Sequence, residues 1–128
     1  MKTVLVVDDE AIVRSVVMRL LERAGYAVAE AGDTEQALLA LETHAVALLI
    51  CDLNLPDAQG TELVAELANR FSGIPAIVLT GAADSSQIDE AKRAGVARIL
   101  FKPFAHQEFL DVVAGELAAG RGGSDGER

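Results

Sequence analysis

Five short apolar segments, separated by longer stretches with helical spacing, constrain the fold of this chain more than any other sequence feature. The segments cover residues 4–7, 27–29, 47–50, 76–79 and 99–101. Each is almost continuously apolar rather than alternating, which predicts strands buried on both faces, as in a parallel sheet covered by helices. Because strands alternate with helices and a strand comes first, the pattern predicts a doubly wound α/β domain.

Local signals mark where the helices between these strands begin and end. Asp33 followed by Gln36, and Asp84 followed by Gln87, predict capping boxes at two helix starts. Glycines at positions suited to a left-handed C-cap are Gly25 and Gly95. We expect one domain over residues 1–119. The glycine-rich composition of residues 120–128 predicts a flexible tail or the start of a linker.

Charge and cysteine content limit the classes of function. A formal net charge of -9 disfavours direct contact with nucleic acid, which is itself a polyanion. The single cysteine, Cys51, excludes an intramolecular disulfide and favours a reducing compartment. No apolar run reaches the roughly 18 residues that a membrane span needs, so we expect a cytoplasmic domain without membrane contact.

Polar side chains stand where the predicted strands end. Asp8 and Asp9 follow the first strand, and Asp52 follows the third. The carboxyl ends of parallel strands meet at one rim, so these acids are expected to lie together. Two carboxylates about 5 Å apart repel each other by roughly 3 kcal/mol at an effective dielectric near 20. Protonation of one acid would relieve this repulsion, but Mg²⁺, with its preference for oxygen ligands, would do so better.

A hydroxyl and a cation are expected at the same rim. Thr80 ends the fourth strand and Lys102 the fifth. Together they suit the oxygens of a phosphoryl group that a carboxylate attacks. Each residue alone has an ordinary explanation, as a turn, a strand end or a surface lysine. Only their combination predicts a site.

At this point the motifs match a known family. They are Val6-Val7-Asp8-Asp9-Glu10, Asp52-Leu53-Asn54-Leu55-Pro56 with Gly60, Leu79-Thr80-Gly81 and Phe101-Lys102-Pro103-Phe104. In this order the chain resembles the receiver domain of two-component response regulators over residues 1–119. The resemblance implies a flavodoxin-like (βα)5 fold with strand order 2-1-3-4-5, which chemotaxis regulators of this family show.

The resemblance also implies a role for each site residue. Asp52 would accept a phosphoryl group from a histidine kinase or a histidine phosphotransfer protein. For Mg²⁺, Asp9 would be a direct ligand, Asp8 would act largely through water, and Asn54 would supply its backbone carbonyl. The two groups expected to hold the phosphoryl oxygens are Thr80 and Lys102.

One position departs from the family pattern. Receivers commonly carry Tyr or Phe three residues before the lysine, and this chain has Ile99. Phe101 should face the same side of the strand by alternation, without being equivalent. Switching is therefore expected to use Thr80, loop movement, or the face formed by the fourth and fifth helices. The output protein or effector domain, and phosphorylation-linked homodimerisation, are left open.

Two other classes of function fit this sequence less well than a signalling switch. An aspartyl-phosphate phosphatase or phosphotransferase would use Asp52 as nucleophile but usually places a second acid two residues later, where this chain has Asn54. A flavodoxin-like cofactor carrier would need a phosphate-binding loop after the first strand, and Asp8-Asp9-Glu10 would repel phosphate there. We therefore do not expect an enzyme acting on a separate substrate.

The remaining candidate residues, apart from those on the first helix, have ordinary structural roles. Cys51 is expected to be a buried strand residue, and His44 and His106 surface residues.

The first helix carries two adjacent apolar rows, one from Ile12 and one from Val13, most of which we expect in the core. Its end beside Asp9 resembles the docking site for kinase or phosphotransfer helices. A charge at Ala11, or Arg14→Glu, should then slow transfer from a protein donor only.

Overall fold

The computed structural model describes the backbone of residues 3–55, 60–71, 73–81 and 84–125, and the side chains of these residues up to 119. Pro56 of the predicted motif lies outside them. Strands and helices alternate as expected. The elements are β1 (Thr3–Val7), α1 (Ala11–Arg23), β2 (Ala27–Ala31), α2 (Thr34–Thr43), β3 (Val46–Asp52), α3 (Gly60–Arg70), β4 (Ala76–Thr80), α4 (Ser85–Ala94), β5 (Arg98–Phe101) and α5 (His106–Asp125).

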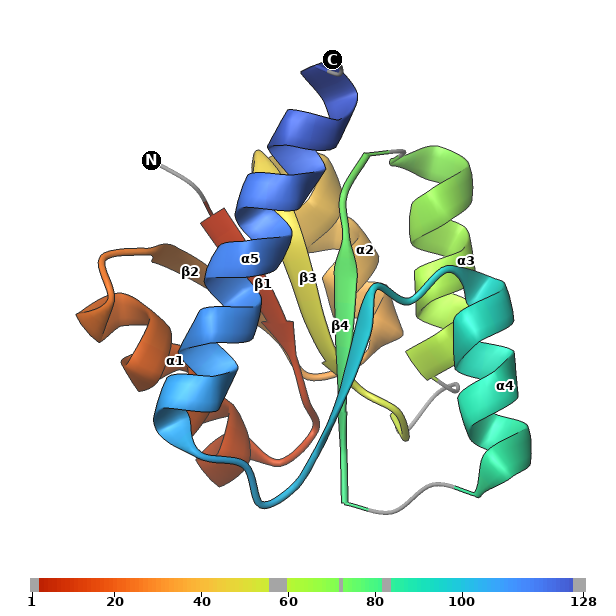
Figure 1. The fold of residues 1–128 in the computed structure, drawn as a ribbon, viewed down its shortest axis with the longest axis horizontal. Coiled ribbons are helices and arrows are strands. Elements are labelled where there is room, and N and C mark those ends of the chain that lie inside the picture. The colour runs from red at the N-terminus through yellow and green to blue at the C-terminus, as the bar shows by residue number, and fades with distance from the viewer. Residues whose placement is uncertain (1–2, 56–59, 72, 82–83, 126–128) are drawn as a thin grey trace.

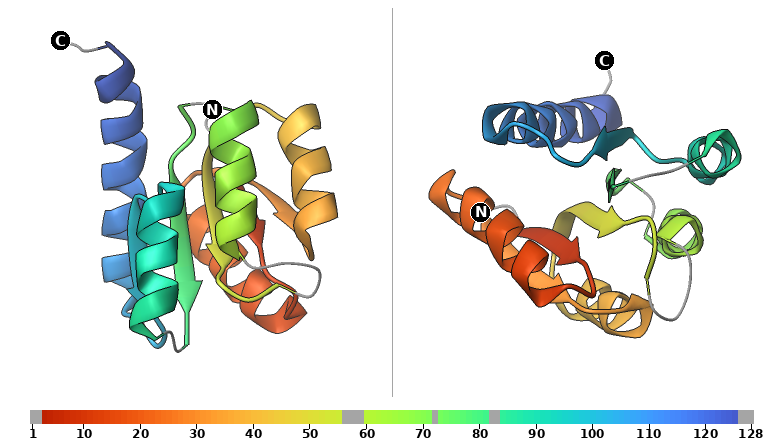
Figure 2. Two further views of the ribbon diagram at one scale, coloured as in Figure 1. Left: turned by 90° about the vertical axis from the view of Figure 1, so that its right-hand side faces the viewer. Right: turned by 90° about the horizontal axis from the view of Figure 1, so that it is seen from below.

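The strands form one parallel sheet in the order β2-β1-β3-β4-β5 (Figure 1), which confirms the predicted flavodoxin-like topology. The helices α1 and α5 lie on one face, and α2, α3 and α4 lie on the other (Figure 2). The chain reverses its direction of winding between β1 and β3. In sheets of this type the ligand site lies at that reversal, beyond the carboxyl ends of the strands, which form the lower edge in Figure 1.

Both faces of the sheet are buried, as the continuous apolar segments predicted. Alternate residues of each strand point to opposite sides. Leu5, Leu49 and Val78 join the core beneath α2 and α3. Their neighbours Leu48 and Ile77 join the core beneath α1 and α5. A strand between two such layers has no solvent-exposed face on which polar residues would be favoured.

The helix ends test the predicted caps. Asp84 and Gln87 form the complete capping box, and Gly95 ends α4 in the left-handed conformation, at φ 99°. Gly25, after α1, has φ 97° as predicted. The predicted box at Asp33 is only half formed. The side chain of Asp33 accepts a hydrogen bond from the backbone N–H of Gln36. The Gln36 side chain, however, accepts from the backbone N–H of Gly32 rather than from that of Asp33, the cap residue.

The last helix extends beyond the predicted domain boundary. α5 ends at Asp125, so the backbone of residues 120–125 is helical. The assignment of residues 120–128 as a tail or a linker stays a prediction. Within the described residues no helix, α5 included, combines the length and apolar character needed to cross a membrane.

Candidate functional site

Strand register brings the predicted acids together. Val7 of β1 is opposite Cys51 of β3, so the residues that follow them, Asp8 and Asp52, lie side by side at the rim. One carboxylate oxygen from each of Asp8, Asp52 and Glu10 lies within 4.8 Å of the others. Hard oxygen donors at this spacing suit a divalent cation such as Mg²⁺. The donor set therefore fits the metal expected from the sequence.

Lys102 lies beside two of these acids. Its ammonium nitrogen is 3.4 Å from Asp52 Oδ2 and 3.7 Å from Asp8 Oδ2. Its backbone N–H donates to the Thr80 carbonyl at 2.8 Å, which joins the ends of β4 and β5. The Lys102–Pro103 peptide bond is cis. Residues that are 50 positions apart in the sequence, Asp52 and Lys102, thus form an ion pair at the rim, as predicted.

The surroundings of Asp8 disfavour its charged form. Burial is the largest cause that raises the pKa of Asp8 above its ordinary value, and the nearby charges of Asp52 and Asp9 raise it further. The Glu10 N–H and the Lys102 ammonium act in the opposite direction but do not cancel these effects. Asp8 is 3% exposed, so water does little to screen the repulsion. A divalent cation would relieve it.

The orientation of Asp52 is determined by two contacts. Its Oδ1 accepts from the Asn54 N–H at 3.0 Å, and its Oδ2 faces Lys102. An open cavity of about 600 Å³ lies over the carboxylate. The residues that line this cavity are Asp9, Glu10, Asp52, Asn54, Gly81 and Lys102. Asp52 is therefore accessible to a small or macromolecular donor.

Thr80 lies at the same rim but not on the cavity wall. It is the last residue of β4 and is 1% exposed. Leu79 is opposite Asp52 in the sheet, which places Thr80 one residue beyond the level of Asp52. Gly81, the next residue, lines the cavity. The predicted contact of the Thr80 hydroxyl with a phosphoryl group stays a prediction.

Glu10 and Arg14 have structural positions that sequence reasoning missed. Glu10 was given no role, yet its carboxylate belongs to the acid cluster, and its N–H donates to Asp8 Oδ1 at 2.9 Å. Its place directly after two acids was the available signal. Arg14 was expected at a docking surface, but its side chain is only 19% exposed and donates to Glu30 and to the backbone of Asp8.

The apolar face of α1 is buried on one side and exposed on the other. Val17 and Leu21 are buried and Leu20 packs against the same core, whereas Ile12 is 81% and Val16 48% exposed. The expectation of core positions is therefore confirmed for Val17, Leu20 and Leu21 and wrong for Ile12 and Val16. The two rows are about 100° apart around the helix, so the orientation of α1 that fully buries one row leaves part of the other exposed. Residues of both rows line an apolar groove of about 250 Å³ with Pro103 and Phe104.

At the other end of the rim, Ile99 and Phe101 lie on the same side of β5. Both line an open cavity of about 300 Å³ next to Ile88 and Lys92 of α4, as alternation along the strand predicted. Ile99 is half-buried and packs against the core beneath α3, whereas Phe101 is 48% exposed. Where receivers commonly have Tyr or Phe, this chain therefore has an aliphatic side chain, Ile99, that borders a cavity.

The residues given ordinary roles have the predicted environments. Cys51 is fully buried, and burial, followed by the charges of Asp52 and Asp8, raises the pKa of its thiol to about 12. A thiol with this pKa is a poor nucleophile and a poor redox sensor near neutral pH. His44 and His106 are exposed.

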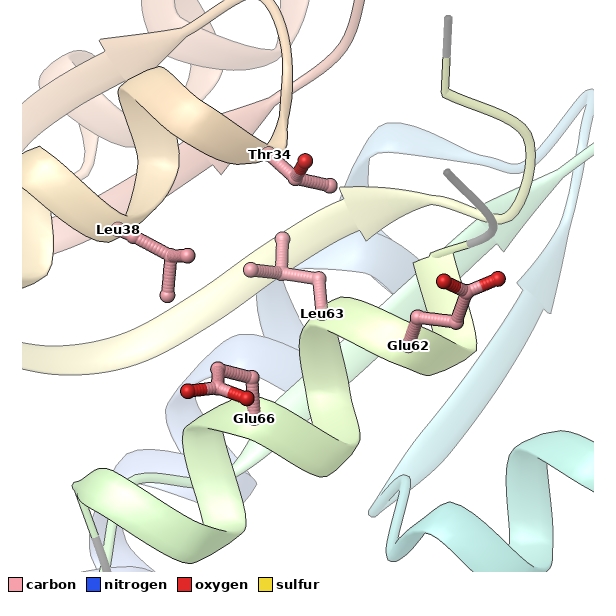
Figure 3. A pocket seen from close by; sticks show the side chains of 5 residues that line it. All are labelled: Thr34, Leu38, Glu62, Leu63 and Glu66. Carbon is pink, nitrogen blue, oxygen red and sulfur yellow. The ribbon is translucent and has the colours of Figure 1, made fainter. Parts of the chain in front are cut away.

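A further hollow of about 210 Å³ lies between α2 and α3 (Figure 3). Leu38 and Leu63 point toward each other across it, with Glu62 and Glu66 beside them. Glu66 is paired with Arg70 at 3.5 Å. Its carboxylate is therefore already partly neutralised.

Comparisons with known proteins relate the chain to one family. Residues 4–114 match the family described as the response regulator receiver domain. The chain is 37% identical over 118 residues to the chemotaxis protein CheY1 of Helicobacter pylori, covering 87% of this chain and 95% of that protein. It is 32% identical to the transcriptional regulatory protein PdtaR of Mycobacterium tuberculosis, covering 94% of this chain but only 58% of that protein. The chain thus spans little more than half of this regulator.

Solved structures show the same likeness. A CheY-like response regulator receiver domain protein from Methanospirillum hungatei superposes with a TM-score of 0.91 at 27% identity, covering 94% of this chain and 97% of that one. The signal receiver domain of an HD domain-containing protein from Pseudomonas fluorescens gives 0.90 at 30% identity, with the same coverage.

Proposed function

This chain belongs to the response regulator receiver domain family, and on that premise we propose that it is a phosphorylation-dependent signalling switch with Asp52 as the acceptor. The observation that carries the proposal is the environment of Asp52. One carboxylate oxygen is held by the Asn54 N–H, and the other faces Lys102 at 3.4 Å, below an open cavity. A carboxylate oriented in this way is ready to attack an incoming phosphorus atom.

In the proposed reaction, an Asp52 carboxylate oxygen attacks the phosphorus of a phosphohistidine. The new O–P bond forms as the P–N bond breaks, and the electron pair of that bond goes to the imidazole nitrogen, which takes up a proton. Lys102 lies where it would stabilise the negative charge of the phosphoryl oxygens. Asn54 has no ionisable proton to donate, so the site gives no support to the phosphatase alternative.

The acids beside Asp52 are proposed to hold Mg²⁺. Asp9 would bind directly, Asp8 largely through water, and the Asn54 carbonyl would complete the set with Asp52. Support comes from the clustered oxygens, and burial followed by the charges of Asp52 and Asp9 raises the pKa of Asp8, so its charged form gains from a nearby cation. When bound, the ion would neutralise the charge of the acids and of the phosphoryl oxygens. Glu10 belongs to the same cluster and is a further candidate ligand.

For the phosphodonor we propose a helix of a histidine kinase or phosphotransfer protein that docks in the groove of α1. Ile12 and Val16 are exposed there, and Lys102 lines the same groove, which places the groove beside the acceptor. Ile12→Glu should slow transfer from a protein donor at least tenfold and leave the rate with a small phosphodonor unchanged. Leu39→Glu, at an equally apolar exposed position on α2, is the control. Equal slowing by both variants would contradict this docking site.

The output of the switch is proposed to be a change in protein contacts as Thr80 closes on the phosphoryl group. Such a switch works by shifting a conformational equilibrium that a partner reads. Relatives such as PdtaR are named transcriptional regulators and are longer than this chain. An effector domain, a separate output protein or a phosphorylation-linked homodimer would each suit this mechanism. A cytoplasmic location, inferred from the single cysteine, stays a prediction.

Intact mass spectrometry after incubation with a small phosphodonor tests the proposal. We expect a mass gain of one phosphoryl group that requires Mg²⁺ and is lost in Asp52→Asn. Asp89→Asn is the matched control, because it removes an exposed carboxylate from α4 outside the cluster. A gain that persists in Asp52→Asn would remove Asp52 as the acceptor.

A further inference from the structure

Arg14 connects three segments behind the acid cluster. From its position on α1, its Nε donates to Glu30 Oε1 of β2 at 2.8 Å, and its Nη1 donates to the backbone carbonyl oxygen of Asp8. The side chain of Arg14 is 19% exposed, and that of Glu30 is 54% exposed. A planar guanidinium can serve two acceptors at once, which the ammonium group of a lysine does poorly.

The Asp8 carbonyl, to which Arg14 donates, lies just beyond the last paired residues of β1 and β2. The last pair between β1 and β2 is Val7 with Ala31, and the Asp8 N–H still donates to the Ala31 carbonyl at 3.1 Å. The Asp8 carbonyl lies one step further along, beyond the paired residues. Because Asp8 is buried, this oxygen needs a donor from within the protein. Arg14 supplies that donor.

The hydrogen bond from Arg14 to the Asp8 carbonyl restrains the turn that carries Asp8, Asp9 and Glu10. The Asp8 carbonyl belongs to the peptide that joins Asp8 to Asp9. On the other side of the turn, the Glu10 N–H donates to Asp8 Oδ1. The turn is therefore held at its backbone by Arg14 and at its carboxylate by Glu10. Loss of either contact would let the carboxylates of the cluster reorient.

Gly32, in the loop after β2, lies beside the guanidinium. A Cβ at Gly32 would be in ordinary van der Waals contact, 3.8 Å from Arg14 Nη1 and 3.5 Å from Gln36 Oε1. Glu30 contacts the Nε side and so fixes the rotation of the guanidinium, while its charge offsets that of Arg14. An ion pair with one half-exposed partner contributes little stability, so its main effect is on orientation.

We propose that Arg14, oriented by Glu30, is a positioning residue that holds the Asp8–Glu10 turn in the geometry required for metal binding. The inference rests on the proposed function, because it takes the acid cluster to be the Mg²⁺ site. Partners that orient metal ligands typically change metal affinity by 10- to 100-fold when removed. Arg14 contacts a ligand residue only through its backbone, so the lower end of that range applies.

Mg²⁺ titration by calorimetry, together with amide hydrogen exchange of the metal-free protein, tests the proposal. We expect Arg14→Ala to weaken Mg²⁺ binding about tenfold and to speed exchange of the Glu10 amide, with Glu30→Ala giving a smaller change in the same direction. The double variant should match Arg14→Ala within twofold, because Glu30 acts through Arg14. Arg19→Ala removes the same charge from an exposed position of α1 and should leave both measurements unchanged.

Several outcomes would overturn the inference. An unchanged Mg²⁺ affinity in Arg14→Ala would do so, even if amide exchange became faster in that variant. Effects of Arg14→Ala and Glu30→Ala that multiply in the double variant would show that Glu30 does not act through Arg14. Equal weakening of Mg²⁺ binding by Arg19→Ala would show that only the charge of the helix matters. A wild-type protein that binds no Mg²⁺ would instead overturn the proposed function. The two failures are thus distinguished by the wild-type titration.

Discussion

The two ends of the sheet's rim differ in how they are held. At the β1–β3 end, Asp8 and Asp52 each have hydrogen bonds or ion pairs on both carboxylate oxygens. At the β4–β5 end, Ile99 and Phe101 border an open, largely apolar cavity. The first arrangement suits chemistry that needs fixed distances, and the second leaves room for movement. We infer that this receiver separates a rigid acid cluster, the proposed acceptor site, from an adaptable region between β5 and α4.

Loss of Lys102 should have the largest effect, because it removes the one cation within the described part of the rigid cluster. Lys102→Ala should slow phosphoryl uptake from a small donor about 100-fold, or about 2.7 kcal/mol, as expected when a single stabilising donor is lost. Mg²⁺ should bind at least as tightly as before, because a competing positive charge is gone. Single-turnover phosphorylation at saturating Mg²⁺ measures the rate.

Lys92→Ala is the control for this prediction, since Lys92 lies at the adaptable end and lines its cavity. Similar slowing by both variants would show that the overall charge of the chain, rather than the ion pair with Asp52, sets the rate.

A single methyl group next to the acceptor should have the next largest effect. A Cβ at Gly60 would lie 2.3 Å from the carbonyl oxygen of Asp52 and 3.1 Å from Leu53, both backbone atoms. Gly60→Ala should therefore lower the free energy of unfolding by about 2–3 kcal/mol through overpacking. Urea denaturation measures the loss.

Gly115→Ala provides the matched comparison, because a Cβ there has no described atom within 4 Å. In the interior of α5 this change should instead stabilise the protein by about 1 kcal/mol. A loss of stability at Gly115, or none at Gly60, would contradict the contrast between a closely packed and a spacious region.

The smallest effect is expected at the adaptable end. Ile99→Tyr enlarges a side chain that already borders a cavity of about 300 Å³. Stability should change by less than about 1.5 kcal/mol, as for well-tolerated core substitutions, and phosphoryl uptake should stay within twofold of wild type. Thermal unfolding and intact mass spectrometry measure the two quantities. A large fall in phosphoryl uptake would show that the two ends of the rim are coupled more tightly than their contacts indicate.

The fold was predictable because the sheet is buried on both faces. Short continuous apolar segments alternating with longer helical stretches are typical of parallel sheets, and they located all five strands to within a few residues. The meeting of Asp8 with Asp52 followed from the same pattern, because strand ends in a parallel sheet converge. Lys102 beside Asp52 was predictable for the same reason.

Side-chain directions in the turn after β1 were not predictable. The run Asp8-Asp9-Glu10 indicated acids at the rim, but alternation ends with the strand, so it did not indicate that Glu10, rather than Asp9, would join Asp8 and Asp52 in the cluster. Arg14 was missed because its partner Glu30 is 16 residues away on another element. The exposure of Ile12 and Val16 depended on how α1 is rotated against the sheet, and that is decided by tertiary packing.

Lys102 belongs to two neighbouring hollows, the acidic cavity over Asp52 and the apolar groove of α1. Whatever fills the groove also displaces water from around this lysine, and charge interactions strengthen as water leaves. A protein donor seated there would therefore change the electrostatic environment of the acceptor as it arrives. A small phosphodonor would meet the fully hydrated form. Recognition and reactivity would then be linked through one side chain, so that the correct partner finds a more reactive acceptor.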